Sequence, residues 1–296
     1  MCGIAGFVND MPIDVKCPVL QRMTDMIAHR GPDSEGHYID EHAALGHRRL
    51  SIIDLGGGQQ PIYNEDGSKV ITFNGEIYNY QTLREELIAA GHTFTTKSDT
   101  EVLLHGYEQW GVDLLQRVRG MFTFVIWDKN KQELFGARDH FGIKPFYYAK
   151  MNGTFMYASE IKSLLRHPDF VKELNAEALK PYMTFQYPAI GETFFKGVYK
   201  LPEGHYFTYR DGKMDIHRYY DEDFREGKQK LGELVNSIDQ TVCDSVKAHQ
   251  IADVEVGSFL SSGVDSSYVA AVARPQHTYS IGFGKGTYNE SQQAGE

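Results

Sequence analysis

The first residues of the chain constrain it most, because they place a cysteine beside the amino terminus at the start of an apolar strand. Residues 1–7 read MCGIAGF. If Met1 is removed, Cys2 carries a thiol and a free α-amine, which is a nucleophile with its own base attached. Their reference pKa values, about 8.5 and about 7.7–8.0, make proton transfer from sulfur to nitrogen cost only roughly 1 kcal/mol. Such an end has to lie in a pocket, and Gly3 and Gly6 allow backbone and ligand to approach. The alternative is a buried strand in which Cys2 is only a small apolar residue.

Bulk composition limits the classes of function. A length of 296 residues predicts two domains. The net charge of −10, without a long basic run, argues against nucleic acid or an acidic membrane as partner. Without an apolar stretch of about 18 residues or a signal-peptide pattern, we expect a soluble, cytoplasmic protein. Three cysteines without Cys-x-x-Cys spacing predict neither a disulfide framework nor a zinc site, and no histidine pair of the metalloprotease type is present.

The first two thirds of the chain alternate helical and strand patterns. An amphipathic helix is expected over residues 18–27, before a Gly-Pro turn. A β-branched strand over residues 70–73 runs into Asn74 and Gly75. Ser98, with a glutamate three residues later, predicts a capping box that opens a helix through residue 110 and puts Asp99 in its first turn. Alternating apolar residues and Asn-Gly and Asp-Gly turns then predict antiparallel hairpins.

The last third changes character after a charged, glycine-containing segment at residues 221–230, which we interpret as a linker. A helix follows, and residues 256–283 then read as strand, Ser/Gly loop, helix and strand, one βαβ unit of a parallel sheet. The predicted domains are 2–205 and 230–296, with a hairpin and linker over 206–229.

Several motifs in order resemble a known family. The opening MCGI, His29–Asp33, Arg49–Ile52, Asn74–Asn79 and Ser98–Glu101 resemble a class II glutamine amidotransferase domain, a member of the N-terminal-nucleophile hydrolases. With residues 138–145 and the Ser-rich loop, the resemblance narrows to the glutamine-hydrolysing asparagine synthetase family and covers essentially the whole chain. It implies a four-layer αββα sandwich (α+β class) followed by the start of an α/β ATP-pyrophosphatase-like domain.

Amide hydrolysis needs a nucleophile, a proton shuttle and hydrogen-bond donors for the tetrahedral oxyanion. Cys2 supplies the first two. The resemblance assigns the donors to the side-chain NH₂ of Asn74 and the backbone N–H of Gly75, where a bare backbone lets the substrate carbonyl approach. The alternative for Asn74-Gly75 is a type I′ hairpin turn, which is weakened because the following residues lead into a helix.

Free glutamine carries a carboxylate and an ammonium, and both need partners in a partly buried pocket. The family pattern assigns the carboxylate to Arg49, in the bidentate manner that guanidinium favours, and the ammonium to Glu76 and Asp99. The glutamine-binding residues that the resemblance implies are Arg49, Leu50, Ile53, Asn74, Gly75, Glu76 and Asp99.

Each charged residue also has a plainer interpretation. Arg49 is alternatively a surface cation beside Arg48, and Asp99 a helix-dipole acid. Arg30 either lies near the nucleophile or is a turn residue paired with Asp33.

The Ser-rich loop is the second candidate site. Backbone N–H groups and hydroxyls ahead of a helix N-terminus bind anions, and the loop resembles the Ser-Gly-Gly-x-Asp-Ser loop of ATP pyrophosphatases, with Asp265 near Mg²⁺. Ser262 stands where the commoner pattern has glycine, so it is strained if its φ is positive. The alternative interpretation is that this Gly/Ser stretch is a connecting loop that binds no ligand. The implied ATP-binding residues are Leu260, Ser261, Ser262, Gly263, Val264, Asp265, Ser266 and Ile281.

These observations predict hydrolysis of glutamine at Cys2 to glutamate and ammonia. In full-length family members the ammonia amidates an ATP-activated aspartate, giving asparagine. The implied small-molecule partners are glutamine, aspartate and ATP with Mg²⁺. The glutaminase half-reaction needs no cofactor. The sequence is compatible with a homodimer. The alternatives are a different adenylated acceptor and a non-catalytic glutamine-binding fragment. Since the chain ends two strands into the second domain, we expect residues 230–296 to be incomplete and only glutaminase competence here.

Overall fold

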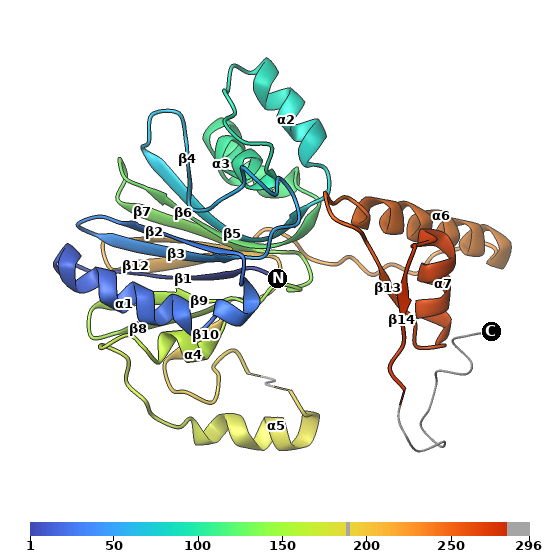
Figure 1. Ribbon diagram of the computed structural model, residues 1–296. Coiled ribbons are helices and arrows are strands. Elements are labelled where there is room, and N and C mark those ends of the chain that lie inside the picture. The colour runs from blue at the N-terminus through green and yellow to red at the C-terminus, as the bar shows by residue number, and fades with distance from the viewer. Residues whose placement is uncertain (188–189, 283–296) are drawn as a thin grey trace. The chain divides into compact units, whose positions relative to one another are not determined.

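The computed structural model describes residues 1–187 and 190–282. The chain divides into two compact units, Met1–Glu222 (unit 1) and Asp223–Glu296 (unit 2). Figure 1 shows the helices and strands of both units.

Unit 1 is built on two six-stranded antiparallel sheets. The first sheet has the order β10 (Val198–Lys200), β8 (Tyr147–Met151), β9 (Thr154–Ala158), β1 (Gly3–Val8), β3 (Ala43–Arg49), β2 (Ser34–Ile39). The second has the order β12 (Lys213–Arg218), β11 (His205–Arg210), β7 (Glu133–Arg138), β6 (Gly120–Asp128), β5 (Lys69–Ile77), β4 (Ile62–Tyr63). The hairpin that we placed between the domains, β11–β12, is therefore part of the second sheet, because β11 pairs with β7.

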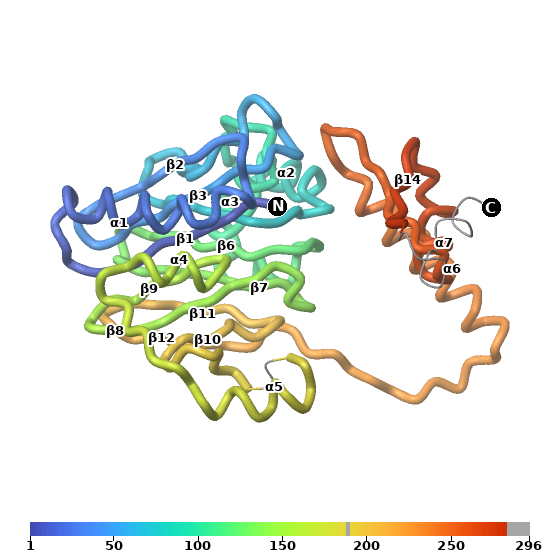
Figure 2. Tube along the Cα trace, turned by 60° about the horizontal axis from the view of Figure 1, so that its bottom comes forward, coloured from blue at the N-terminus to red at the C-terminus, as the bar shows by residue number. Residues whose placement is uncertain are grey.

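The two sheets pack face to face with helices outside them. Along β1, Ile4 faces a core that includes Val125 and Phe207 of the second sheet, whereas Ala5 and Phe7 face the helix side. This alternation is the period of two of a strand buried on both faces. Helices α1 (Ile13–Asp25) and α4 (Ile161–Leu164) cover the first sheet, and α3 (Asp99–Trp110), with α2 (Tyr80–Ala89) beside it, covers the second (Figures 1 and 2). The predicted αββα sandwich is confirmed.

Short helical segments complete unit 1. They are η1 (Ala28–Arg30), η2 (Gly111–Gln116), η3 (Ala176–Ala178) and α5 (Leu179–Phe185).

Two local predictions need correction. Helix α1 begins at Ile13 rather than at residue 18, so Pro18 lies inside it. Ser98 does cap α3, its Oγ accepting the Thr100 N–H at 3.2 Å, but the second half of the predicted capping box is absent. Glu101 instead accepts the N–H and hydroxyl groups of Thr95 and Thr96, at 2.6–3.0 Å. The preceding loop offers this carboxylate four donors, whereas the capping box would offer it one.

Unit 2 contains the predicted βαβ arrangement. Its elements are α6 (Leu231–His249), β13 (Ser258–Phe259), α7 (Val264–Ala273) and β14 (Thr278–Tyr279). Strands β13 and β14 are parallel, with Ser258 opposite Thr278. No residue of α6 or α7 is buried. The last predicted strand spans residues 279–283, but β14 ends at Tyr279 and residues 280–282 form no strand; residue 283 lies outside the described residues.

Candidate active site

Cys2 lies directly before β1, with its thiol against the backbone of Leu50. Its Sγ accepts the Leu50 N–H at 3.4 Å and faces the Leu50 carbonyl at 3.5 Å. Burial raises the pKa of the Cys2 thiol, and the Leu50 hydrogen bond only partly opposes that shift. The thiol therefore needs a nearby base to become a thiolate.

Arg30 contacts the nucleophile residue. Its Nε donates to the Cys2 carbonyl at 2.9 Å, and its Nη1 pairs with Glu160 at 3.1 Å. Asp33 has a different role, because its carboxylate accepts the Ser51 N–H at 2.8 Å. Of the two interpretations of Arg30, the structure supports the position beside Cys2.

A cavity opens at Cys2, walled by residues from four segments of unit 1. Both Cys2 and Asp99, the latter in the first turn of α3, line this cavity. Five of the predicted site residues line it: Cys2, Ile53, Gly75, Glu76 and Asp99. The other lining residues are Ile52, Gln60, Phe73, Ser98 and Thr100. Arg49, Leu50 and Asn74 do not line the cavity, although Asn74 stands between Phe73 and Gly75 in the chain.

Asn74 and Gly75 lie within β5, opposite Thr123 and Phe122 of β6, so they form no hairpin turn. Asn74 is 1% exposed, and neither atom of its amide has a hydrogen-bond partner among the described residues. A buried amide with unused donors, one residue from the cavity wall, suits an oxyanion donor.

Gly75 is required by strand packing. A Cβ there would lie 2.2 Å from the Met121 carbonyl oxygen and 2.7 Å from the Phe122 Cα. The sequence suggested that substrate approach demands this glycine, but the neighbouring strand is sufficient reason.

Arg49 is a buried side chain, 5% exposed, and not a surface cation. Its guanidinium donates to the carbonyls of Ile53 at 3.1 Å and Asp54 at 2.6 Å. The surface role belongs to its neighbour Arg48, which pairs with Asp25. Arg49 thus fastens the loop that carries Ile53 into the cavity.

Asp99 is buried in the first turn of α3. One carboxylate oxygen accepts the Ile77 N–H at 3.0 Å, and the other accepts the Ser98 hydroxyl at 3.3 Å. Burial raises the pKa of Asp99 to about 7, and the neighbouring Glu76 adds to that rise. A helix-dipole acid would sit at the surface with a low pKa. A buried carboxylate at a cavity wall is instead suited to a cationic ligand.

Sequence reasoning missed Gln60, which braces the cavity from the loop after β3. Its Oε1 accepts the Phe73 N–H at 2.6 Å and its Nε2 donates to the Thr100 hydroxyl at 3.2 Å. Nothing in the glycine-rich stretch around it marks this role, because it depends on the loop of Gln60 meeting a strand and a helix.

Lys144 was also missed as an individual residue, although its motif was noticed. The Asp139 carboxylate accepts four backbone N–H groups, including that of Lys144 at 3.0 Å. Arg138 donates to the Lys144 carbonyl at 2.7 Å. The resulting loop holds the Lys144 side chain at Met1, with Nζ 2.9 Å from the Met1 sulfur, and burial lowers the pKa of Lys144.

The predicted nucleotide loop connects β13 to α7. Ser266 Oγ accepts the Ser261 N–H at 3.2 Å and donates to the Gly263 carbonyl at 3.1 Å. Ser262 has a φ of +60°, so the strained backbone that its replacement of glycine implied is present. Asp265 and Val264 lie in the first turn of α7. Leu260 and Ile281 follow β13 and β14, whose parallel carboxyl ends share one edge.

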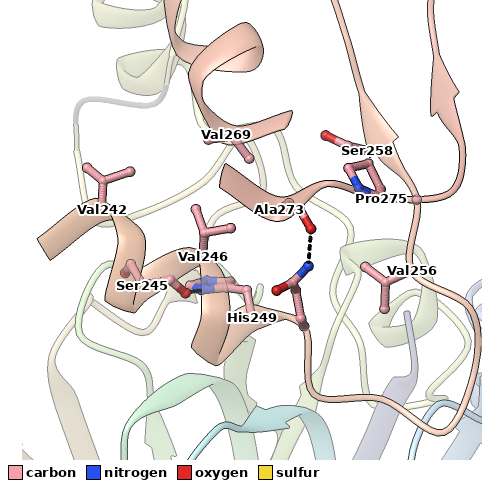
Figure 3. Close-up of a pocket in the computed structure, with 11 residues that line it drawn as sticks. Val242, Ser245, Val246, His249, Val256, Ser258, Val269, Ala273 and Pro275 are labelled. Carbon is pink, nitrogen blue, oxygen red and sulfur yellow. Dashed lines mark hydrogen bonds between the residues drawn. The ribbon is translucent and has the colours of Figure 1, made fainter. Parts of the chain in front are cut away.

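A separate apolar pocket in unit 2 lies between α6, α7 and the approach to β13. Val246, Val269 and Ala273 are among its lining residues, and the Gln250 side chain donates to the Ala273 carbonyl across it (Figure 3). The lining contains none of the residues 261–266, so this pocket is distinct from the predicted nucleotide loop.

The αββα fold and the Cys2 cavity together are those expected of a glutamine amidotransferase domain, and the comparison with protein families agrees. Residues 1–220 match the glutamine amidotransferase domain, so the chain belongs to that family. Residues 237–296 match asparagine synthase, and the chain thus joins a glutamine amidotransferase domain to part of an asparagine synthase domain.

Individual relatives agree with this family assignment. The chain is 44% identical to asparagine synthetase [glutamine-hydrolyzing] 1 of Bacillus subtilis (strain 168), over 100% of this chain and 48% of that protein. It is 40% identical to asparagine synthetase [glutamine-hydrolyzing] 2 of the same strain, over 95% of this chain and 40% of that protein. The chain therefore spans about half the length of these relatives or less.

A solved structure shares the fold. Glutamine phosphoribosylpyrophosphate amidotransferase from B. subtilis, complexed with ADP and GMP, gives a TM-score of 0.55 at 17% identity, covering 95% of this chain and 66% of that one. At that identity the likeness concerns the fold alone. No helix in the described part of the chain has the length and apolar character needed to cross a membrane.

Proposed function

We propose that this protein hydrolyses the side-chain amide of glutamine, with Cys2 as nucleophile. The observation that carries the proposal is that the Cys2 thiol and the buried Asp99 carboxylate line the same cavity. A thiol for the amide and an anion for the α-ammonium match the two ends of one small amino acid. Glu76, on the same wall, adds negative charge for the ammonium.

The chemistry begins with removal of Met1, which frees the α-amine of Cys2. That amine takes the thiol proton, and the sulfur attacks the amide carbon. Asn74 Nδ2 and the Gly75 N–H stabilise the oxyanion. Collapse of the tetrahedral intermediate, with a proton returned from the amine, breaks the C–N bond and releases ammonia. Water then hydrolyses the glutamyl thioester to glutamate.

The position of Met1 supports the proposal that its removal is needed for catalysis by Cys2. With Met1 present, its sulfur contacts Lys144 Nζ and the free amine belongs to residue 1 instead of residue 2. Retention of Met1 would displace the base from the nucleophile by about 3.8 Å.

For the synthetase half we propose that the released ammonia amidates an ATP-activated aspartate, in a chain that carries the whole domain. The match of residues 237–296 to asparagine synthase supports this. The hydroxyls and N–H groups of residues 261–266, at the start of α7, suit a pyrophosphate. Asp265 offers the hard oxygen ligand that Mg²⁺ prefers, so the residues present fit a Mg²⁺–ATP complex.

The test is glutamate release from glutamine, with intact-mass measurement of the same sample. We expect a mass without Met1 and measurable activity, and we expect Cys2→Ala to lower the rate by at least about 10³-fold. Wild-type-level glutamate release by the Cys2→Ala protein would overturn the proposal. A chain with the whole synthetase domain should then form AMP from ATP only when aspartate is present. AMP formation with another acid in its place would indicate a different acceptor.

A further inference from the structure

A cluster of two histidines and two glutamates lies in unit 1 away from the Cys2 cavity lining. Glu65 follows β4, His92 follows α2, and His105 and Glu108 lie on α3, three residues apart. One ligand atom from each lies within 4.8 Å of the others; the cluster consists of Glu65, His92, His105 and Glu108. We propose that this cluster binds a divalent transition-metal ion of the zinc type.

The donor atoms of the four residues lie close together. His92 Nδ1 and His105 Nδ1 each lie 3.4 Å from an oxygen of Glu65, and His105 Nδ1 lies 3.1 Å from Glu108 Oε2. Four ligands at tetrahedral corners, with bonds of about 2.0–2.2 Å, lie about 3.3–3.6 Å from one another. The two histidines approach different oxygens of Glu65, so these three distances do not all belong to one set of four ligand atoms; such a set, with one atom from each residue, lies within 4.8 Å.

The outer ring nitrogen of His92 faces an oxygen acceptor, as in metal sites, because His92 Nε2 lies 3.3 Å from Gln109 Oε1. His105 Nε2 lies 3.5 Å from Glu101 Oε1 and makes no hydrogen bond among the described residues. A ligating histidine characteristically donates its other N–H to an oxygen acceptor, which fixes the tautomer and directs the free lone pair toward the metal. Glu101 is itself held in place by the N–H and hydroxyl groups of Thr95 and Thr96.

The charges around the cluster suit a dication. Glu65, Glu101 and Glu108 carry three negative charges, and Lys69, 3.5 Å from Glu108, carries one positive charge. With neutral histidines the group has two negative charges in excess, which one divalent ion balances. Two imidazoles with two carboxylates suit Zn²⁺ better than Mg²⁺ or Ca²⁺, which prefer oxygen ligands alone.

The sequence predicted no zinc site, because it lacks Cys-x-x-Cys spacing and a histidine pair of the metalloprotease type. His92 and His105 come together only in the fold, where their ring centroids are 5.0 Å apart. The metal would join the β4–β5 turn and the loop after α2 to the helix that carries Asp99. The competing explanation is a metal-free ion-pair network in which His105 carries a proton.

The experiment uses the full chain, stripped with a chelator and titrated with Zn²⁺ and separately with Co²⁺. We expect one Zn²⁺ per chain and a rise in the unfolding temperature of unit 1. Bound Co²⁺ should show the visible bands of four-coordinate cobalt without the near-ultraviolet charge-transfer band that a cysteine ligand, such as Cys2, would add.

Three variants separate the two explanations. His92→Gln and Glu65→Gln alter ligands that are not fully buried, so both should fold, and each should weaken Zn²⁺ binding by at least about 10-fold. His217→Gln, on exposed β12, is the matched control and should bind Zn²⁺ like the wild type. Equal Zn²⁺ affinity in wild type, His92→Gln and Glu65→Gln, or no Zn²⁺ binding by the wild type, would establish the ion-pair network and overturn the metal site.

Discussion

At the scale of single residues, Asp99 has the most direct consequence for ligand binding. Its buried carboxylate has a pKa of about 7, and a bound ammonium stabilises the ionised form. Below pH 7 the carboxyl is increasingly neutral in the empty pocket. We therefore expect the dissociation constant of glutamine to rise as pH falls, approaching tenfold per unit below about pH 6.

Calorimetric titration of glutamine into Cys2→Ala protein between pH 5 and 8 measures this without turnover. The Asp99→Asn variant in the same background should bind weakly with a nearly flat profile. A steep profile that persists in Asp99→Asn would assign the pH dependence to another group.

Asp99 also links the site to stability. Its folded pKa, about 7, lies above its ordinary value of 3.8, so folding favours the protonated form. The stabilisation is complete below about pH 4 and is lost as pH rises toward 7. Asp99→Asn should therefore raise the free energy of unfolding at pH 8, by up to about 4 kcal/mol. Urea unfolding at pH 4 and pH 8 tests this, and the gain should vanish at the lower pH.

Gly75 gives a third residue-scale prediction. Gly75→Ala places a methyl group 2.2 Å from a backbone oxygen of β6, which cannot move aside as a side chain could. We expect a loss of about 3 kcal/mol or more in unfolding free energy. Gly191→Ala is the control, since its Cβ would meet nothing within 4 Å. Similar stabilities for the two variants in urea would contradict the packing role of Gly75.

At the scale of elements, the loop between β7 and β8 is organised by one carboxylate. Asp139 accepts four backbone N–H groups, and an asparagine could replace only part of that set. Asp139→Asn should cost of the order of 2–4 kcal/mol in unfolding free energy, since hydrogen bonds to a charged group are the stronger kind. Chemical denaturation measures it, with the exposed Asp113→Asn as a near-neutral control.

Element boundaries were predictable where one local interaction decides them. The Ser98 cap and the first-turn position of Asp99 follow from a hydroxyl competing for helix N–H groups, which is a short-range effect. The role of Glu101 was mispredicted because its donors, Thr95 and Thr96, belong to a loop whose course depends on tertiary packing.

At the scale of the whole molecule, the two units differ in how much they bury. Unit 1 contains extensive buried clusters on both faces of its first sheet, whereas α6 and α7 of unit 2 bury no residue. Residues 219–230 form neither helix nor strand. Local opening should therefore be easiest in unit 2 and the segment before it.

Limited trypsin digestion tests this difference. We expect the first cuts at Arg225, Lys228 and Lys230, leaving a resistant product close to residues 1–222 by intact mass. Early cuts within the two six-stranded sheets would show that unit 1 is not the more stable part.

The motifs of the sequence, through their resemblance to a known family, determined the class of this protein, its αββα architecture and five of the ten residues that line the Cys2 cavity. The cysteine at residue 2, the strand periodicity and the Ser98 helix cap were recognisable because they are local properties of the chain. Only the tertiary structure decided which neighbours each side chain meets. Burial of Asp99 and Arg49, the unpartnered amide of Asn74, the brace from Gln60 and the meeting of His92 with His105 all join segments far apart in sequence. Desolvation and convergence depend on that packing, and no single segment encodes them.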